Sequence, residues 1–302
     1  MNIKSIKLCI LGGGWSNERK ISLKSSNDVY ECLKENNHDV LFYDMKNDEP
    51  SELEKFLKDN NVDLVFNLIH GEGGEDGKVQ GYLDSLNISY CGSNASASFI
   101  SFNKHLTKKV WIDNDLITPR YEVYKSQTYK TCSEIFGAQF FIKDTCSGSS
   151  NNIYLISNNK DFKSFALEYN SSREYIIEEK IIANEYTAAV LNNDVLPIIK
   201  IIPSNTFYDY DAKYQSNTTK FIFPKLSKEM TNKIKHNVLK AYKALGCKDW
   251  ARVDFFIKND EIVLLEINTI PGMTDHSLVP KAANKKGITY YELIIKILDK
   301  NV

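Results

Sequence analysis

The sequence lacks paired cysteines, long hydrophobic runs and an excess of charge of either sign, and each absence excludes a class of protein. The six cysteines are scattered and include no CxxC pair, so neither a zinc site nor a disulfide framework is indicated. Scattered cysteines in apolar segments are typical of the reducing cytoplasm, which is the expected location. A formal net charge of −1 gives no electrostatic basis for binding nucleic acid or a membrane surface.

No stretch approaches the roughly 18 apolar residues that a membrane-spanning helix needs. The apolar run near the N-terminus, Leu8 to Leu11, is too short for a signal peptide. There is no internal repeat and no low-complexity tract. The length of 302 residues, with 42% hydrophobic and 25% charged residues, instead predicts two or three globular domains with substantial cores.

The first 95 residues alternate between short apolar runs and amphipathic segments. The runs predict strands and the segments predict helices, in the order 6–11, 22–36, 40–43, 51–59 and 62–69. Ser22 stands where the N-cap of the first helix is expected. Strands that alternate with helices predict a parallel, doubly wound sheet whose ligands bind at the carboxyl ends of its strands.

Two glycine-rich loops follow strands of this region. The first, Gly12–Gly14, is neither a GxGxxG motif nor a P-loop, and a tight turn explains it as well as a ligand does. Glu18 follows this loop and could contact a substrate or could only supply the charge at a helix start. The second loop, His70–Gly77, is too polar for a core, and its glycines let the backbone approach a ligand closely.

The middle of the chain predicts further strands and helices, at 103–114, 139–143, 154–156, 160–169, 175–179, 185–191, 195–202 and 227–245. Lys104 opens the first of these helices, where a solvent-exposed lysine is the ordinary alternative to a functional one. The loop Asp144–Asn152 consists of small hydrogen-bonding residues, which could close over phosphates or could form a flexible surface loop. The polar segment 203–221 is typical of a lid or binding loop.

The stretch Trp250–Ser277 carries the most specific pattern. Arg252 and Asp254 are two residues apart, and so are Glu266 and Asn268, so each pair shares one face of a strand. A polar break between the two pairs predicts a hairpin turn. If that turn is odd-numbered and centred on Asp260, Asp254 lies opposite Glu266. The other face is then apolar and faces a core, with Val253, Phe255, Val263, Leu265 and Ile267.

Two carboxylates and an amide oxygen on one face favour a bound hard cation, Mg²⁺ or Mn²⁺, because like charges repel each other without one. Arg252 beside them is a fixed positive charge suited to phosphate oxygens or to a developing oxyanion. The alternative interpretation is a solvated acidic face of an ordinary hairpin.

Five motifs follow one another along the chain: GGGWSNERKIS, HGEGGEDGKVQG, KDTCSGSS, TFYDYDAKY and LEINTIPGMTDHSLVP. In order and spacing they resemble the motifs of D-alanine–D-alanine ligases, an ATP-grasp family, over essentially the whole chain. The resemblance implies an α/β protein of three domains, 1–95, 96–180 and 181–302, with ATP held between the second and third. It also implies that two D-alanines are joined through an acyl phosphate for peptidoglycan precursors, by a cytoplasmic homodimer.

The resemblance assigns the nucleotide and metal contacts. It implies that Asp254, Glu266 and Asn268 are the ligands of two Mg²⁺ or Mn²⁺ ions. The residues that resemble ATP contacts are Lys104 and Lys143 for the α- and β-phosphates, Lys213 for the γ-phosphate, Glu178 and Glu185 for the adenine amino group and the ribose, and Phe207 over the adenine.

The substrate contacts follow from the same motifs. Glu18 resembles the group that receives the ammonium of the first D-alanine, and His70 lines that subsite. Ser277 and the backbone of Leu278 resemble the dock for the carboxylate of the second D-alanine. The remaining roles are the oxyanion donors, Arg252 and the Gly272 N–H, and the closure contacts, Ser149 and Tyr214, which meet Ser22 and Glu18.

Some positions depart from the family pattern. Asp144 stands where the family usually has proline, and Asn151 and Asn152 stand where it usually has an aliphatic residue and glycine. None of these changes removes a catalytic group, but the phosphate loop could close differently. Two related activities stay open, D-Ala-D-lactate and D-Ala-D-Ser ligation. From another class, a nucleotide-binding pseudoenzyme is an alternative, although the metal ligands, the lysines and Arg252 are all present.

Overall fold

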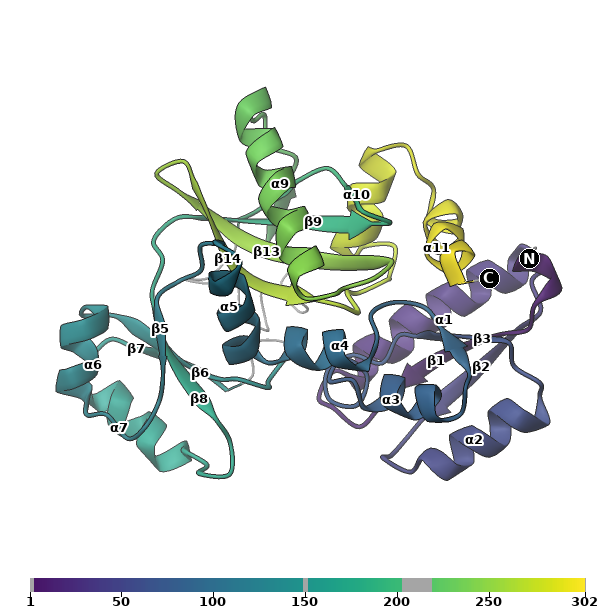
Figure 1. Cartoon of the computed structure of the whole chain (residues 1–302), viewed down its shortest axis with the longest axis horizontal. Helices are drawn as coiled ribbons and strands as arrows, with labels where there is room; N and C mark the ends of the chain where they lie inside the picture. The colour runs from purple at the N-terminus through teal and green to yellow at the C-terminus, as the bar shows by residue number, and fades with distance from the viewer. Residues whose placement is uncertain (1–2, 149–151, 203–218, 302) are drawn as a thin grey trace.

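The computed structural model describes residues 3–148, 152–202 and 219–301, which form three β-sheets with helices around them (Figure 1). One sheet lies in the N-terminal third of the chain, one in the middle and one in the C-terminal part. Short 3-10 turns, Ile3–Ser5 and Asp299–Asn301, lie near the two ends. No helix in these described ranges is long and apolar enough to cross a membrane.

The N-terminal sheet is parallel and four-stranded, in the order β2-β1-β3-β4. Its strands are β1 (Leu8–Gly13), β2 (Val40–Met45), β3 (Leu64–Asn67) and β4 (Ser89–Tyr90), and its helices are α1 (Arg19–Glu35), α2 (Pro50–Asp59) and α3 (Lys78–Ser85). All of β1 is buried. Leu8 and Ile10 belong to one core cluster, whereas Cys9 and Leu11 belong to another. Both faces of the sheet are therefore covered, which confirms the expected doubly wound arrangement.

The expected N-cap at Ser22 is wrong. Helix α1 begins at Arg19 with Glu18 as its N-cap residue, because the preceding loop already turns, with the Arg19 N–H donating to the Ser16 carbonyl at 3.1 Å. Ser22 is fully buried within the helix, and its hydroxyl donates to the Leu68 carbonyl at 2.8 Å. Ser22 thus ties α1 to the chain that leaves β3.

The central sheet is antiparallel, in the order β5-β8-β6-β7. It contains β5 (Tyr121–Val123), β6 (Phe140–Asp144), β7 (Ile153–Ile156) and β8 (Tyr175–Glu179), with α6 (Tyr129–Phe136) and α7 (Asn159–Glu168). Helix α6 was not expected from the sequence. The core of this lobe is a separate aromatic-rich cluster that includes Phe136, Phe140, Phe162 and Phe165.

The C-terminal sheet is antiparallel, in the order β12-β11-β9-β13-β14, and β10 also pairs with β9. Its strands are β9 (Asn184–Leu191), β10 (Asp194–Val195), β11 (Ile199–Ile202), β12 (Lys220–Ile222), β13 (Trp250–Lys258) and β14 (Glu261–Asn268). Helix α9 (Lys228–Ala244) covers one face, and the Ser227 hydroxyl accepts a hydrogen bond from the Met230 N–H at its start. The long helix expected at 227–245 is confirmed.

Two helices, α4 (Ala95–Phe102) and α5 (Lys104–Asp113), connect the N-terminal sheet to the central lobe (Figure 1). Trp111 of α5 is fully buried against the C-terminal lobe, and its ring N–H donates to the Ala241 carbonyl of α9 at 3.2 Å. The domain boundaries at 95 and 180 remain a prediction.

The helices α10 (Leu278–Lys285) and α11 (Tyr290–Leu298) pack the end of the chain back against its beginning (Figure 1). One core cluster contains Ile10 and Phe66 of the N-terminal sheet together with Trp250 of β13 and Leu293 of α11. The rings of Phe66 and Trp250 meet edge to face, with centroids 5.8 Å apart. A continuous core therefore fixes the N-terminal sheet relative to the hairpin β13–β14.

Candidate active site

The hairpin β13–β14 brings the expected polar residues onto one face. Asp254 pairs with Glu266, and Arg252 pairs with Asn268. Directly paired residues on antiparallel strands have neighbouring side chains. The four side chains therefore form one polar cluster on the face away from α9, as the spacing of two predicts.

The expected odd-numbered turn is wrong, although the pairing that it predicts is right. The turn consists of two residues, Asn259 and Asp260, both with positive φ, as a tight primed turn requires. A register shift between Asp254 and Phe255 adds one unpaired residue, Leu265, to β14. This bulge places Glu266 opposite Asp254.

The bulge also changes which residues of β14 face the core. The cluster under α9 takes Ile262, Leu264 and Ile267 from this strand, in place of the expected Val263 and Leu265. Val253 and Phe255 of β13 lie in the same cluster, as expected. Strict alternation fails here because the extra residue shifts the phase of the strand by one position.

Asp254 is the most deeply buried member of the polar cluster, at 1% exposed. Arg252 donates to it from Nε at 3.0 Å and from Nη2 at 2.9 Å, and the Thr187 hydroxyl of β9 donates at 2.5 Å. The guanidinium is thus held in a fixed orientation, and the buried carboxylate is paired and hydrogen-bonded. The amide oxygen of Asn268 accepts from the Ile270 N–H at 2.9 Å, which fixes that side chain as well.

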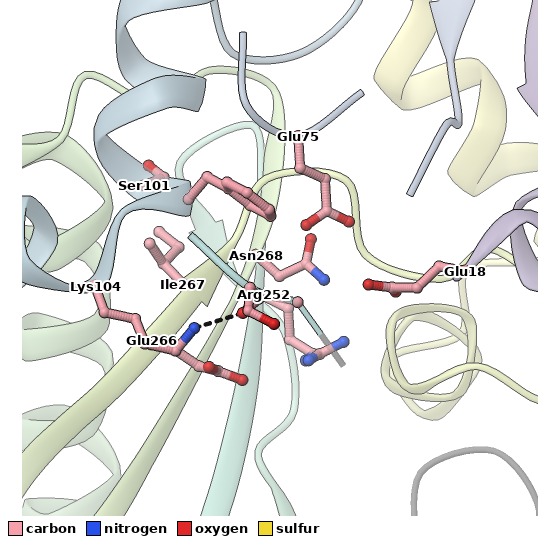
Figure 2. Close-up of a pocket in the computed structure, with 11 residues that line it drawn as sticks. Glu18, Glu75, Ser101, Lys104, Arg252, Glu266, Ile267 and Asn268 are labelled. Carbon is pink, nitrogen blue, oxygen red and sulfur yellow. Dashed lines mark hydrogen bonds between the residues drawn. The ribbon is translucent and has the colours of Figure 1, made fainter. Parts of the chain in front are cut away.

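A pocket is lined by this cluster together with residues from the N-terminal and central parts of the chain (Figure 2). Its wall includes Glu18 at the start of α1, Lys104 at the start of α5, and Glu266 of β14. The remaining lining residues are Glu75, Ser101, Phe102, Ser147, Gly148, Arg252, Ile267 and Asn268. Residues up to about 250 positions apart thus face one cavity, and most of its polar groups are charged.

Two loops approach Glu18, which is 6% exposed. Gly148, in the loop after β6, lies so close that a Cβ there would be 2.5 Å from Glu18 Oε1. Gly71, after β3, has φ +73°, and a Cβ there would be 3.2 Å from the same oxygen and 2.9 Å from the Ser16 hydroxyl. Close approach requires glycine at both positions. For Gly71 this is the role expected of the second glycine-rich loop.

His70 is buried between the N-terminal and C-terminal parts of the chain, at 2% exposed. Its Nδ1 lies 2.9 Å from the Ile270 carbonyl, and its Nε2 lies 3.3 Å from the Ser25 hydroxyl. A carbonyl only accepts, so Nδ1 carries the proton and donates. The Ser25 hydroxyl also accepts from the Met273 N–H at 3.3 Å. His70 therefore positions the segment after β14 that contains Gly272.

Ser277 is the N-cap residue of α10, a helix that was not expected from the sequence. Its hydroxyl accepts from the Thr274 N–H at 3.1 Å and lies 2.8 Å from the Thr274 hydroxyl. A Cβ on Gly272 would come within 2.9 Å of the same hydroxyl. The backbone N–H of Leu278 belongs to the first turn of the helix, where N–H groups attract anions.

Lys104 contacts the loop that follows β6, and Lys143 lies on β6 directly before it. The Lys104 ammonium donates to the Ser147 carbonyl at 2.6 Å, as the dashed line in Figure 2 shows. The Lys143 ammonium contacts Glu178 of β8, which is 2% exposed. The other oxygen of Glu178 lies 2.6 Å from the ammonium of Lys108, a lysine of α5 that is 1% exposed.

The pKa values of Lys108 and Glu178 both lie below their ordinary values, but for different reasons. Loss of hydration lowers the pKa of Lys108 to about 8, although the charge of Glu178 opposes the shift. Burial alone would raise the pKa of Glu178, but Lys108 and Lys143 outweigh it and hold that pKa below its ordinary value. The carboxylate is therefore charged at neutral pH.

Asp144, one of the departures from the family pattern, organises the described part of the phosphate loop. It is 1% exposed, accepts from the Cys146 N–H at 2.9 Å, and forms a 2.6 Å ion pair with Arg173. The side-chain amide of Asn152, another departure, lies 3.4 Å from the same carboxylate. The two departures thus contact each other. Where the family usually has a rigid proline, this chain has a carboxylate that forms an ion pair with Arg173.

Comparison with known proteins identifies the family. The family model described as the D-ala D-ala ligase C-terminus matches residues 114–299, and the model of the D-ala D-ala ligase N-terminus matches residues 44–93. The chain belongs to the D-alanine–D-alanine ligase family. The D-alanine–D-alanine ligase of Saccharophagus degradans is 40% identical over 298 residues, covering 96% of this chain and 92% of that protein.

Solved structures of the D-alanine–D-alanine ligase family share the fold. The Bacillus anthracis D-alanine–D-alanine ligase complexed with ATP superposes with a TM-score of 0.84 at 28% identity, covering 98% of this chain and 97% of that one. The VanG D-Ala:D-Ser ligase of Enterococcus faecalis superposes with a TM-score of 0.81 at 27% identity, covering 98% and 99%. The resemblance inferred from the five motifs and the ATP-grasp fold class are confirmed.

Several family contacts fall outside the described residues: Ser149, Phe207, Lys213 and Tyr214. Glu185 lies on β9 and is half-buried, one strand further along the chain than Glu178 of β8. These two carboxylates belong to different sheets, the C-terminal and the central one. Their assigned roles remain predictions.

Sequence reasoning missed several residues that shape the site, among them Lys108, Glu75 and Thr187. Lys108 lies four residues after Lys104, so the helical spacing could have indicated a second lysine on a similar side of α5. Glu75 lies within the second glycine-rich motif, lines the pocket and approaches His70 Nδ1 to 3.6 Å. Thr187 gives no signal in the sequence, because strand pairing alone places it opposite Asp254.

The donor set of the polar cluster fits a hard divalent cation. Asp254, Glu266 and Asn268 offer only oxygen atoms, which Mg²⁺ and Mn²⁺ prefer. Within residues 3–148, 152–202 and 219–301 no three His, Cys, Asp or Glu side chains form such a group, so the amide of Asn268 would complete the set. Arg252 balances part of the negative charge on the same face.

Proposed function

We propose that this chain joins two D-alanines to D-alanyl-D-alanine at the expense of ATP, through an acyl phosphate, to supply peptidoglycan precursors. The observation that supports this most directly is the pocket in which Glu18, Lys104, Arg252, Glu266 and Asn268 come together. It combines groups for an ammonium, for phosphates and for a metal within one cavity. An acyl transfer driven by a nucleotide needs all three.

The nucleotide contacts would come from helix α5 and from the central and C-terminal sheets. Lys104 and Lys143 would bind the α- and β-phosphates, with Lys213 on the γ-phosphate, and position the terminal phosphoryl group for attack by a carboxylate. Glu178 and Glu185 would hold the adenine amino group and the ribose, and Phe207 would cover the adenine. The loop that begins at Asp144 would supply backbone N–H donors.

Asp254, Glu266 and Asn268 would hold two Mg²⁺ or Mn²⁺ ions, which would offset negative charge on the transferring phosphoryl group. The protein's own contribution is to keep these oxygen donors toward the open end of the hairpin, away from its turn, beside a fixed arginine. The pairing of Arg252 with Asp254 preserves this arrangement within the fold.

The amino-acid subsites would be formed by residues of the N-terminal part of the chain and by the segment after β14. Glu18 would receive the ammonium of the first D-alanine, and His70 and Ser22 would keep that subsite in shape through their contacts with neighbouring backbone. Ser277 and the Leu278 N–H would bind the carboxylate of the second D-alanine. Arg252 and the Gly272 N–H would stabilise the tetrahedral oxyanion, and Ser149 and Tyr214 would close the site against water.

A D-Ser acceptor is a second candidate, because the VanG D-Ala:D-Ser ligase shares the fold over 98% of this chain. The deciding experiment supplies ATP and D-Ala with D-Ser or D-lactate in competition, and measures ADP release and the products by mass spectrometry. We expect ADP release that depends on D-Ala and a product that is mainly D-Ala-D-Ala. A mainly D-Ala-D-Ser product would establish the second candidate, and no D-Ala-dependent ADP release would exclude both. A homodimer in the cytoplasm is the expected working form.

A further inference from the structure

Lys108 is a buried lysine that the proposed reaction leaves without a role. Its ammonium lies 2.6 Å from Glu178 Oε2, donates to the Thr118 hydroxyl at 2.7 Å and lies 3.4 Å from the Pro119 carbonyl. An ammonium has three N–H donors, so all three are directed at acceptors that the fold holds in place. Lys108 is therefore fixed.

Glu178 is shared between two lysines. Lys108 contacts one carboxylate oxygen and Lys143 contacts the other. Glu178 is 2% exposed, Lys108 1% and Lys143 7%. One carboxylate neutralises only one of the two ammonium groups, so this buried trio carries one unbalanced positive charge beside the phosphate loop.

The two lysines differ in how many contacts hold them. Lys143 lies near the end of β6, directly before the phosphate loop, and its hydrogen bond within the described ranges goes to Glu178. Its ammonium also lies 5.1 Å from the centroid of the Phe141 ring, a weaker contact. Lys143 can turn away from Glu178 at the loss of one hydrogen bond, whereas Lys108 would lose three contacts.

We propose that Lys108 is a positioning residue that remains the permanent counter-ion of Glu178 and thereby releases Lys143 to bind the β-phosphate. The inference rests on the proposed function, in which Lys143 contacts the nucleotide. If Lys108 were absent, Lys143 would be the remaining cation on Glu178. Moving Lys143 to a phosphate would then leave a buried carboxylate unpaired, which is strongly unfavourable.

The affinities of AMP and ADP, measured by calorimetry with Mg²⁺, isolate this effect. Both nucleotides share the adenine, the ribose and the α-phosphate, so the ratio of their dissociation constants reports the β-phosphate contact. Lys108→Met should reduce the preference for ADP about tenfold, the usual size of one charge-assisted hydrogen bond. The matched control is Lys109→Met, which removes an exposed lysine from the same helix and should leave the ratio unchanged.

A double variant separates positioning from a general structural role. Lys108→Met with Glu178→Gln removes both charges, so Lys143 is no longer retained and the preference for ADP should return to that of Glu178→Gln alone. A Lys108→Met protein with the native preference, or a double variant with a lower preference than Glu178→Gln, would overturn the proposal. If Lys108→Met does not fold, the comparison of the double variant with Glu178→Gln decides by itself.

A third variant tests the premise. Lys143→Met should abolish most of the preference for ADP. If it does so while Lys108→Met has no effect, the positioning role of Lys108 is wrong and the phosphate contact of Lys143 stands. If Lys143→Met leaves the preference unchanged, the phosphate contact proposed for Lys143 is wrong, and the role of Lys108 falls with it.

Discussion

Asp254 connects three strands through a single buried carboxylate. It accepts from Arg252 on its own strand and from Thr187 on β9, and it is paired with Glu266 on β14. Removing the charge of Asp254 would therefore disturb Arg252 as well as the proposed metal site. Glu266 is only half-buried, so its substitution separates a loss of chemistry from a loss of folding.

Glu266→Gln is expected to lower ligase turnover on the order of 100-fold, as the loss of one electrostatic contact to a transition state typically does. The midpoint of thermal unfolding should stay close to the native one, because the shape of the side chain is kept. The measurement is D-Ala-dependent ADP release at several Mg²⁺ concentrations. Glu261→Gln, an exposed glutamate on the same strand, is the control and should retain native turnover. Native turnover in Glu266→Gln would remove Glu266 from the metal site.

The pKa of Glu178, held below its ordinary value of 4.5, predicts a pH dependence of stability. A carboxyl group whose pKa is lower in the folded than in the unfolded state stabilises the fold above its unfolded pKa. That stabilisation is lost as the pH falls through the folded pKa. The native protein should therefore lose more stability below about pH 4.5 than the Lys108→Met/Glu178→Gln variant. Urea midpoints measured across this range test it, and parallel pH profiles would contradict it.

At the scale of elements, the two-residue turn between β13 and β14 sets the site's register together with the bulge at Leu265. Asn259 has φ +50° and Asp260 has φ +61°. Asp260→Gly should stabilise the protein by roughly 0.5–1 kcal/mol, because glycine adopts this conformation without strain. Asn259→Val should instead destabilise it by about 1–3 kcal/mol. Urea unfolding measures both, and ligase turnover of Asp260→Gly should be native.

The start of the loop after β6, where we propose that phosphates bind, is a second element, and one ion pair holds its Asp144 in place. Arg173→Ala leaves the buried Asp144 carboxylate without its cation, so the Michaelis constant for ATP should rise several-fold. Stability should fall by about 1–3 kcal/mol. Arg173→Lys should recover part of both. Arg120→Ala, which removes an exposed arginine from the same lobe, is the control. An unchanged Michaelis constant in Arg173→Ala would show that the ion pair does not shape nucleotide binding.

At the scale of the whole molecule, the hydrophobic core clusters do not correspond one to one to the three sheets. The N-terminal sheet shares its core with Trp250, α10 and α11, whereas the central lobe has a core of its own. Native-state hydrogen exchange should therefore show amides of β6 and β8 opening independently. Amides of β1, β3 and α11 should exchange together. Simultaneous exchange of all these strands would show that the central lobe is not a separate cooperative unit.

Local pattern determined much of the fold and the site. Alternating strands and helices predicted the parallel N-terminal sheet, and the spacing of two placed Arg252 and Asp254 on one face, because side-chain direction in a strand repeats every second residue. The glycine-dense loop 70–77 predicted the close approach at Gly71. The five motifs predicted the family.

Only the tertiary structure decided which distant residues meet. The bulge at Leu265 changed the core face of β14, since one inserted residue reverses alternation and local spacing cannot reveal it. The Glu178 carboxylate with its two lysines, and the ion pair of Asp144 with Arg173, join segments 29 to 70 positions apart. Burial strengthens these pairings, and the burial of a side chain depends on how distant segments of the chain pack together.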